Sequence, residues 1–182
     1  MASVNTLCKS VLNVKNTVIK NCNLYSDKNG VKHIRIQARP NKWHENDCPF
    51  CHKSCPVYDK HSSRPTIWRG LDWGGILVEV EYQTHRLICP EHGVYVAEVP
   101  WAYPCSRFTK DFDLTAAWFA SYLPRSTTSY FMRVDWETVG RCVNRALHDL
   151  EPERSRRLDG LVNIGIDETS YKKGHKLSLI HI

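Results

Sequence analysis

The sequence contains no apolar run that approaches the roughly 18 to 20 residues of a membrane span. Its first 13 residues lack the charged, then apolar, then small-residue order of a secretory signal. It also has no internal repeat and no low-complexity segment. We therefore expect a folded cytoplasmic protein with no membrane partner.

The composition is that of a folded chain with a basic balance. Of the 182 residues, 42% are hydrophobic and 24% are charged, which favours one medium domain or two to three small ones. Lys and Arg number 25 against 19 Asp and Glu, and the net charge of +6 is compatible with a polyanionic partner without requiring one. Thiols stay reduced in the cytoplasm, so metal binding is the better expectation for the eight cysteines than disulfide bonding.

The first hundred residues favour β-structure. Residues 14–39 predict a β-hairpin around a polar turn at 26–30, and residues 41–65 are typical of a loop. A second strand pair is expected from Thr66, with its turn at Gly74-Gly75. In its second strand one face is apolar or uncharged and consists of Ile76, Val78, Val80, Tyr82 and Thr84.

Beyond Pro104 the apolar spacing becomes helical. One helix is expected between Ser106 and Pro124, and a short apolar piece follows at 130–132. The clearest helix begins after Asp135, a natural N-cap, and its apolar positions recur from Val139 to Leu150 at helical spacing. The predicted fold class is α+β: a β-hairpin and zinc-ribbon module (1–103), a helix-turn-helix domain (104–150), a linker (151–160) and a final segment (161–182) that opens with a strand.

Two short motifs of the same build predict a metal site. They are Cys48-Pro49-Phe50-Cys51 and Cys89-Pro90-Glu91-His92, each with two ligands three positions apart. Such turns let both side chains reach one tetrahedral Zn²⁺, and four protein ligands make a closed structural site. We expect the Gly74-Gly75 hairpin to fill the long stretch between the two motifs. The predicted ligands are Cys48, Cys51, Cys89 and His92.

Other cysteines and histidines leave the ligand set open. Cys55 lies four positions after Cys51 and could replace His92, and His52 is a weaker alternative. The remaining cysteines have no partner at metal-ligand spacing. We interpret Cys8, Cys22 and Cys142 as core thiols and Cys105 as a turn residue.

Residues 126–150 have the proportions of a helix-turn-helix. With its apolar stripe buried, the second helix would present Glu137, Thr138, Arg141, Asn144, Arg145 and His148 on its other face. Of these we predict Thr138, Arg141, Asn144 and Arg145 to bind DNA. Arg can bond guanine and Asn adenine through two hydrogen bonds, so Arg141 and Asn144 are the candidates for reading bases. Lys110, Arg125 and Arg133 would suit phosphates. The alternative is a solvated face of an ordinary helical bundle.

An apolar strand at 163–166 ends in Asp167 and Glu168. A carboxylate at the end of a buried strand is where metal-dependent phosphoryl-transfer enzymes hold Mg²⁺. Asp is also common in turns that follow strands, so this motif by itself is weak evidence for a catalytic role.

Taken in order, these motifs resemble the insertion-sequence transposases of the ISL-three type. The resemblance runs from about residue 16 to 176. The matching stretches are Cys48-Pro49-Phe50-Cys51, Cys89-Pro90, Ser106-Arg107-Phe108-Thr109, Val134-Asp135-Trp136-Glu137-Thr138-Val139-Gly140-Arg141, and Ile164-Gly165-Ile166-Asp167-Glu168 followed by Lys172-Lys173-Gly174-His175-Lys176. Two departures are His92, where the family usually has cysteine, and Cys105, where a small residue is common.

The resemblance implies a bacterial protein with a zinc finger, a helix-turn-helix and a DDE catalytic domain with an RNase H-like core. It makes Asp167 the first catalytic acid and places the second Asp and the Glu beyond Ile182, so this chain would be an inactive N-terminal fragment. The complete enzyme would bind double-stranded DNA at the element's ends, use Mg²⁺ for cleavage and strand transfer, and form a homo-oligomer. The alternative is a non-catalytic DNA-binding regulator, and a third interpretation is a zinc-ribbon interaction module.

The last six residues, 177–182, depart from the family. Leu-Ser-Leu-Ile-His-Ile is encoded by CTG-TCT-CTT-ATA-CAC-ATC, which resembles a transposon mosaic end used as a sequencing adapter. We expect these residues to be read-through of an adapter, although the run is also apolar enough to be a natural short strand.

Overall fold

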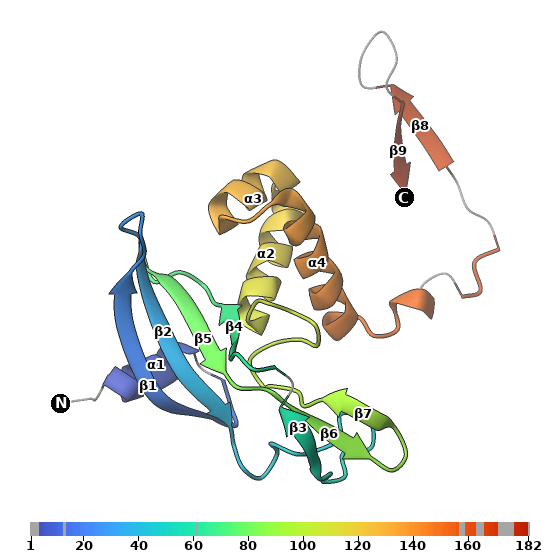
Figure 1. Cartoon of the computed structure of the whole chain (residues 1–182). Helices are drawn as coiled ribbons and strands as arrows, with labels where there is room; N and C mark the ends of the chain where they lie inside the picture. The colour runs from blue at the N-terminus through green and yellow to red at the C-terminus, as the bar shows by residue number, and fades with distance from the viewer. Residues whose placement is uncertain are drawn as a thin grey trace. The chain divides into compact units, whose positions relative to one another are not determined.

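The computed structural model describes residues 4–12, 14–60, 62–156, 159–162, 166–170 and 177–181. The chain forms two compact units, Met1–Leu147 and His148–Ile182. The first unit contains two sheets and the helical segment (Figure 1). Within the described ranges, no helix is long and apolar enough to cross a membrane.

The larger sheet has four strands in the order β1-β2-β5-β4. Strands β1 (Thr17–Ser26) and β2 (Lys32–Pro40) form an antiparallel hairpin, and β4 (Thr66–Arg69) and β5 (Leu77–Tyr82) form another. The two hairpins join through β2 and β5, which run parallel. Both predicted hairpins are therefore confirmed, whereas their parallel junction was not predicted.

The first hairpin turn is built by Asp27. Its Oδ1 accepts hydrogen bonds from the backbone N–H groups of Asn29 (2.9 Å) and Val31 (2.8 Å). Gly30 adopts φ +78°, a conformation that glycine reaches without a Cβ clash. The turn residues thus fix the register in which β1 and β2 pair.

Helix α1 (Val4–Leu12) covers the apolar face of this sheet, and the sequence analysis did not predict it. Nine residues are too few for a stable isolated helix, so α1 depends on packing rather than on its own propensity. Cys8 and Leu12 enter the sheet's core. The other buried members of this core are Ile36, Ala38, Trp68, Val78, Val80, Val99, Trp101 and Ala102.

The smaller sheet has three antiparallel strands in the order β3-β6-β7. They are β3 (Val57–Lys60), β6 (His85–Cys89) and β7 (Gly93–Val96). The prediction that 41–65 is all loop is wrong at β3, a short strand with largely exposed side chains that is defined by its pairing with β6. The Gly74-Gly75 hairpin lies in the stretch of sequence between the two Cys-containing turns, as predicted, but its strands β4 and β5 belong to the larger sheet.

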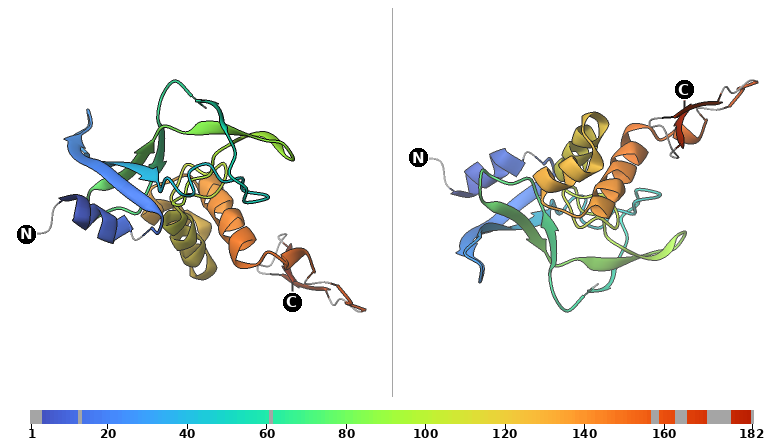
Figure 2. Two further views of the ribbon diagram at one scale, coloured as in Figure 1. Left: turned by 90° about the horizontal axis from the view of Figure 1, so that it is seen from below. Right: turned by 90° about the horizontal axis from the view of Figure 1, so that it is seen from above.

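Three helices follow, namely α2 (Lys110–Tyr122), α3 (Arg125–Met132) and α4 (Trp136–Leu150). The views in Figures 1 and 2 show α2 and α4 side by side. The predicted N-cap is confirmed, because Asp135 Oδ1 accepts from the backbone N–H of Thr138 at 2.8 Å. Between α3 and α4 the backbone turns at Arg133, which has φ 52°.

Arg69, the last residue of β4, joins the four-stranded sheet to the helices. Its backbone N–H donates to the Arg107 carbonyl and its carbonyl accepts from the N–H of Thr109, the N-cap of α2. Its guanidinium donates to the Arg133 carbonyl at 2.8 Å, in the turn before α4. The start of α2 and the α3–α4 turn are thereby fixed to the same strand end.

The second unit contains a short 3₁₀ turn at Arg154–Arg156 and an antiparallel pair, β8 (Ile166–Ser170) and β9 (Leu177–His181). Asp167 pairs in register with Ile180. The apolar strand predicted at 163–166 overlaps β8 only at Ile166, and residues 163–165 lie outside the described ranges. Residues 177–181, which the sequence analysis attributed to an adapter, form β9.

Candidate metal centre and nucleic-acid interface

Two turns carry the cysteines and the histidine that the sequence analysis singled out. Cys48 and Cys51 lie in the turn before β3, where the backbone N–H of His52 donates to the Cys48 carbonyl. Cys89 ends β6, and His92 lies in the turn to β7. Gly93 closes that turn at φ +77° and pairs in register with Cys89. Strand pairing thus brings together residues 38 or more positions apart.

Cys48, Cys51, Cys89 and His92 form a cluster that could hold a metal ion, with one ligand atom from each within 4.8 Å of the others. The sulfurs of Cys51 and Cys89 are 3.8 Å apart. His92 Nδ1 is 3.5 Å from the sulfurs of both Cys48 and Cys89. Around a tetrahedral ion with bonds of about 2.3 Å to sulfur and about 2.05 Å to nitrogen, these distances would be about 3.8 and 3.5 Å. The cluster therefore has the dimensions of a four-ligand site.

Cys55 and His52, the alternative ligands, are not members of this cluster. Cys55 is buried, and its sulfur lies 3.5 Å from the Lys53 carbonyl oxygen. His52 is exposed, with its backbone at φ 56°.

The cluster's surroundings favour the thiolate form of Cys89. Burial by itself would raise the pKa of this thiol, but the backbone N–H of Glu91 and the ring and backbone of His92 donate toward its sulfur and hold the pKa below its ordinary value. Thiolates are the form of cysteine that binds metal ions. Phe50 covers one side of the His92 ring at a centroid distance of 5.0 Å.

Helix α4 presents Arg141 and Asn144 on its exposed side, together with Glu137. The Arg141 guanidinium donates to Thr138 Oγ1 at 2.9 Å, and the Thr138 hydroxyl donates to Asp135 Oδ2 at 2.7 Å. Thr138 itself is only 5% exposed. Thr138 is thus placed to orient Arg141 rather than to touch a ligand.

Arg145, another predicted DNA-binding residue, makes an intramolecular ion pair. Its Nε and Nη2 donate to the two carboxylate oxygens of Asp113 at 2.8 Å each. Asp113 lies on α2, is fully buried and also accepts from Ser106 Oγ at 3.0 Å. Arg145 therefore holds α4 against α2, and its donors toward Asp113 are not available to a base.

The three predicted phosphate-binding residues all contact neighbouring side chains. Arg125 lies over the ring of Trp136 at 5.5 Å, and Lys110 over Tyr103 at 5.3 Å. Arg133 pairs with Asp72 at 3.4 Å while half of its side chain stays exposed. These contacts orient the cations without removing them from solvent, since Arg125 is exposed and Lys110 partly so.

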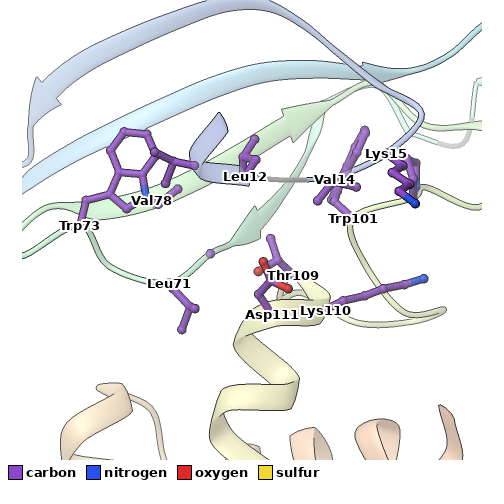
Figure 3. Close-up of a pocket in the computed structure, with 13 residues that line it drawn as sticks. Leu12, Val14, Lys15, Leu71, Trp73, Val78, Trp101, Thr109, Lys110 and Asp111 are labelled. Carbon is purple, nitrogen blue, oxygen red and sulfur yellow. The ribbon is translucent and has the colours of Figure 1, made fainter. Parts of the chain in front are cut away.

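A cavity of about 440 Å³ lies beside the start of α2, and Figure 3 shows the residues that line it. Leu12 and Val14 line one side, and Thr109, Lys110 and Asp111 line the other. Lys110 is the only predicted site residue in its lining. This cavity therefore belongs neither to the metal cluster nor to the exposed side of α4.

Comparison with known proteins finds two curated transposases that are similar to this chain. The chain is 36% identical over 172 residues to the transposase for insertion sequence element IS1557 of Mycobacterium tuberculosis, in both strain CDC 1551 and strain H37Rv. The chain is therefore similar in sequence to insertion-sequence transposases over most of its own length. The match covers 93% of this chain and 38% of each relative, so the chain spans well under half of their length. No family model matches, and no solved structure does.

Sequence reasoning missed Asp113 as a functional position. The available signal was an acidic residue between two apolar ones, Phe112 and Leu114, because a carboxylate that is buried with its apolar neighbours needs a cation as partner. Asp167 belongs to β8. The position of its side chain lies outside what the structure describes.

Proposed function

We propose that this chain is the end-binding part of an insertion-sequence transposase of the ISL-three type. The observation that carries the proposal is the similarity to IS1557 transposase along 93% of the chain. In the bound complex the exposed side of α4 would lie in the major groove of the element's terminal repeats. A protein that acts on bacterial DNA in this way would be located in the bacterial cytoplasm. The complete enzyme would form a homo-oligomer and cut and rejoin DNA.

We further propose that the four-residue cluster holds a structural zinc ion. Three thiolates and one imidazole are ligands that zinc prefers, and four protein ligands leave no open position for catalysis. The ion would join the turn before β3 to the turn after β6. An exposed ion pair between Lys53 and Glu91 links the same two turns.

Of the α4 residues that were predicted to bind DNA, we propose that Arg141 and Asn144 contact the bases. Arg145 is paired with Asp113 and Thr138 is buried, so both support the reading helix from within the protein. Arg141 keeps donors free besides the one bonded to Thr138, since a guanidinium has five. Two of these suffice for a guanine. Arg125, Arg133 and Lys110 are the proposed phosphate contacts.

Arg141→Ala should weaken binding to the terminal repeat by about 1–3 kcal/mol, or roughly 5- to 150-fold, because a pair of hydrogen bonds to a base is lost. Fluorescence anisotropy with terminal-repeat DNA and with a scrambled duplex measures this change. The preference for the terminal repeat should fall as well. An equal loss on both duplexes would instead make Arg141 a phosphate contact.

A matched control is Arg156→Ala, which removes another exposed arginine that pairs with a nearby acid, Glu153, at 3.5 Å. It should leave sequence preference unchanged.

Each phosphate contact should steepen the slope of log K against log salt by about 0.9. A binding constant that does not respond to salt, or no binding at low salt, would contradict the DNA-binding proposal.

Catalysis is proposed for a chain extended to the length of its relatives, with Asp167 as the first Mg²⁺ ligand. In that protein Asp167→Asn should abolish strand transfer and preserve end binding, since the amide cannot replace a charged metal ligand. Gel assays of joined and bound DNA separate the two steps. The neighbouring change Glu168→Gln is the control and should retain joining, and joining by the Asp167→Asn variant would refute the assignment.

A further inference from the structure

Cys8 and Cys22 lie together outside the metal cluster. Cys8 belongs to α1 and Cys22 to β1, 14 positions later, and their sulfurs are 2.7 Å apart. Cys8 is fully buried and Cys22 is half-buried. Their spacing matches no metal-binding motif, so the sequence alone predicts two separate core thiols.

The distance between these sulfurs excludes a shared metal ion. In the four-residue cluster the sulfurs of Cys51 and Cys89 are 3.8 Å apart, which is the separation of about 3.8 Å expected for two thiolates on one tetrahedral ion. The sulfurs of Cys8 and Cys22 are more than 1 Å closer than that. Moreover, in the described part of the chain no third Cys, His, Asp or Glu joins them in a metal-binding group.

The backbone that carries Cys22 is held by strand pairing, and the backbone that carries Cys8 is held by packing in the core. Cys22 pairs in register with Ile36 of β2, just beyond an irregularity in β1 between Ile19 and Asn21. Cys8 packs with Leu12 and Ile36 in the core of the four-stranded sheet. Helix packing and strand pairing therefore hold the two sulfurs close together from both sides.

We propose that Cys8 and Cys22 are a dithiol site that closes to a disulfide by exchange with a low-molecular-weight disulfide. The Cys22 thiolate attacks one sulfur of the reagent, whose S–S bond breaks and whose other half leaves as a thiolate. The Cys8 thiolate then attacks the Cys22 sulfur and expels the second half. The reagent takes up two electrons and the two thiol protons, and becomes two thiols.

Burial and the neighbouring Cys8 raise the pKa of the Cys22 thiol to about 12. Little thiolate is then present at neutral pH, so exchange should be slow.

Closing this disulfide ties α1 to β1. Leu12, at the end of α1, lines the cavity in Figure 3 opposite Thr109, the N-cap of α2. Fixing α1 therefore fixes one wall of that cavity. A cross-link over 14 positions should raise the melting temperature by on the order of 5 to 10 °C, because it restricts the unfolded chain.

The test is incubation of the metal-loaded 182-residue chain with oxidised glutathione, followed by alkylation of the remaining thiols and peptide mapping by mass spectrometry. We expect one disulfide-linked peptide pair that contains Cys8 and Cys22, with the bound metal retained. Retention is checked by metal analysis of the same sample. Recovery of Cys8 and Cys22 as alkylated thiols, or of stable glutathione adducts at Cys22, would overturn the proposal.

Two variants complete the test. Cys22→Ser should abolish the rise in melting temperature on oxidation, whereas Cys142→Ser, which removes a buried thiol from α4, should keep it. The peptide map of the unmodified chain decides the question even if a variant folds poorly. A rise in melting temperature that persists in Cys22→Ser would refute the site.

Discussion

Removal of the metal ion should unfold the three-stranded sheet while α2, α3 and α4 stay helical. The core of that sheet consists of Cys48, Cys55, Leu87, Cys89 and Ala97, so Leu87 is its one large hydrocarbon side chain among the described residues. Burying a leucine contributes about 1.5–3 kcal/mol, whereas a structural zinc site contributes on the order of 10 kcal/mol. Without the ion the sheet keeps only weaker support, namely its strand pairing, the partly buried Tyr95 and the half-exposed ion pair of Arg86 with Asp59.

Chelation and Cys48→Ser should have the same effect. Hydrogen exchange should show loss of protection in β6 and retention in α4, and metal analysis should fall from one ion per chain to none. Cys105→Ser, at an exposed position, is the control and should change neither result. A purified chain that contains no metal but keeps β6 protected would disprove the structural role of the site.

Cys55→Ser separates the two possible ligand sets. Cys55 is buried beside the cluster but is not one of the four residues that converge. The variant should keep its metal ion and lose only part of its stability. Metal loss in Cys55→Ser, together with retention in His92→Ala, would make Cys55 the fourth ligand.

Asp113→Asn should destabilise the first unit by about 3–5 kcal/mol, because it removes one member of a buried ion pair and leaves the Arg145 guanidinium without its charge partner. The amide also disturbs the hydrogen bond from Ser106. Urea unfolding followed by far-UV circular dichroism measures the loss. The double change of Asp113→Leu with Arg145→Met should recover much of it, since no charge then remains buried.

The exposed pair of Arg156 and Glu153 is the matched comparison, with side chains 71% and 77% exposed. Glu153→Gln should leave stability unchanged within error, because water screens an exposed pair. If Asp113→Asn were equally harmless, the pair would not hold α4 in place. That result would contradict the proposal that Arg145 supports α4 within the protein and does not contact DNA bases.

Arg141 and Arg145 show which features of α4 helical periodicity can predict and which it cannot. Both lie off the apolar stripe of α4, and the sequence analysis therefore assigned both to DNA. The structure exposes Arg141 but turns Arg145 toward Asp113, 32 positions earlier in the chain. Periodicity identifies which residues lie outside the apolar stripe of a helix, but it cannot identify an ion-pair partner on another helix.

The sequence by itself determined the local features of this protein. Motif spacing specified the two turns that carry the candidate metal ligands, turn residues specified the hairpins, and the Asp135 cap with the apolar period specified α4. Each depends on residues within a few positions of one another, where covalent geometry restricts the choices. Tertiary structure decided the parallel junction of β2 and β5, the docking of α1 that brings Cys8 to Cys22, and the pairing of Asp113 with Arg145. These features depend on which apolar surfaces, far apart in the sequence, are buried against each other. That pairing is determined only when the whole unit packs.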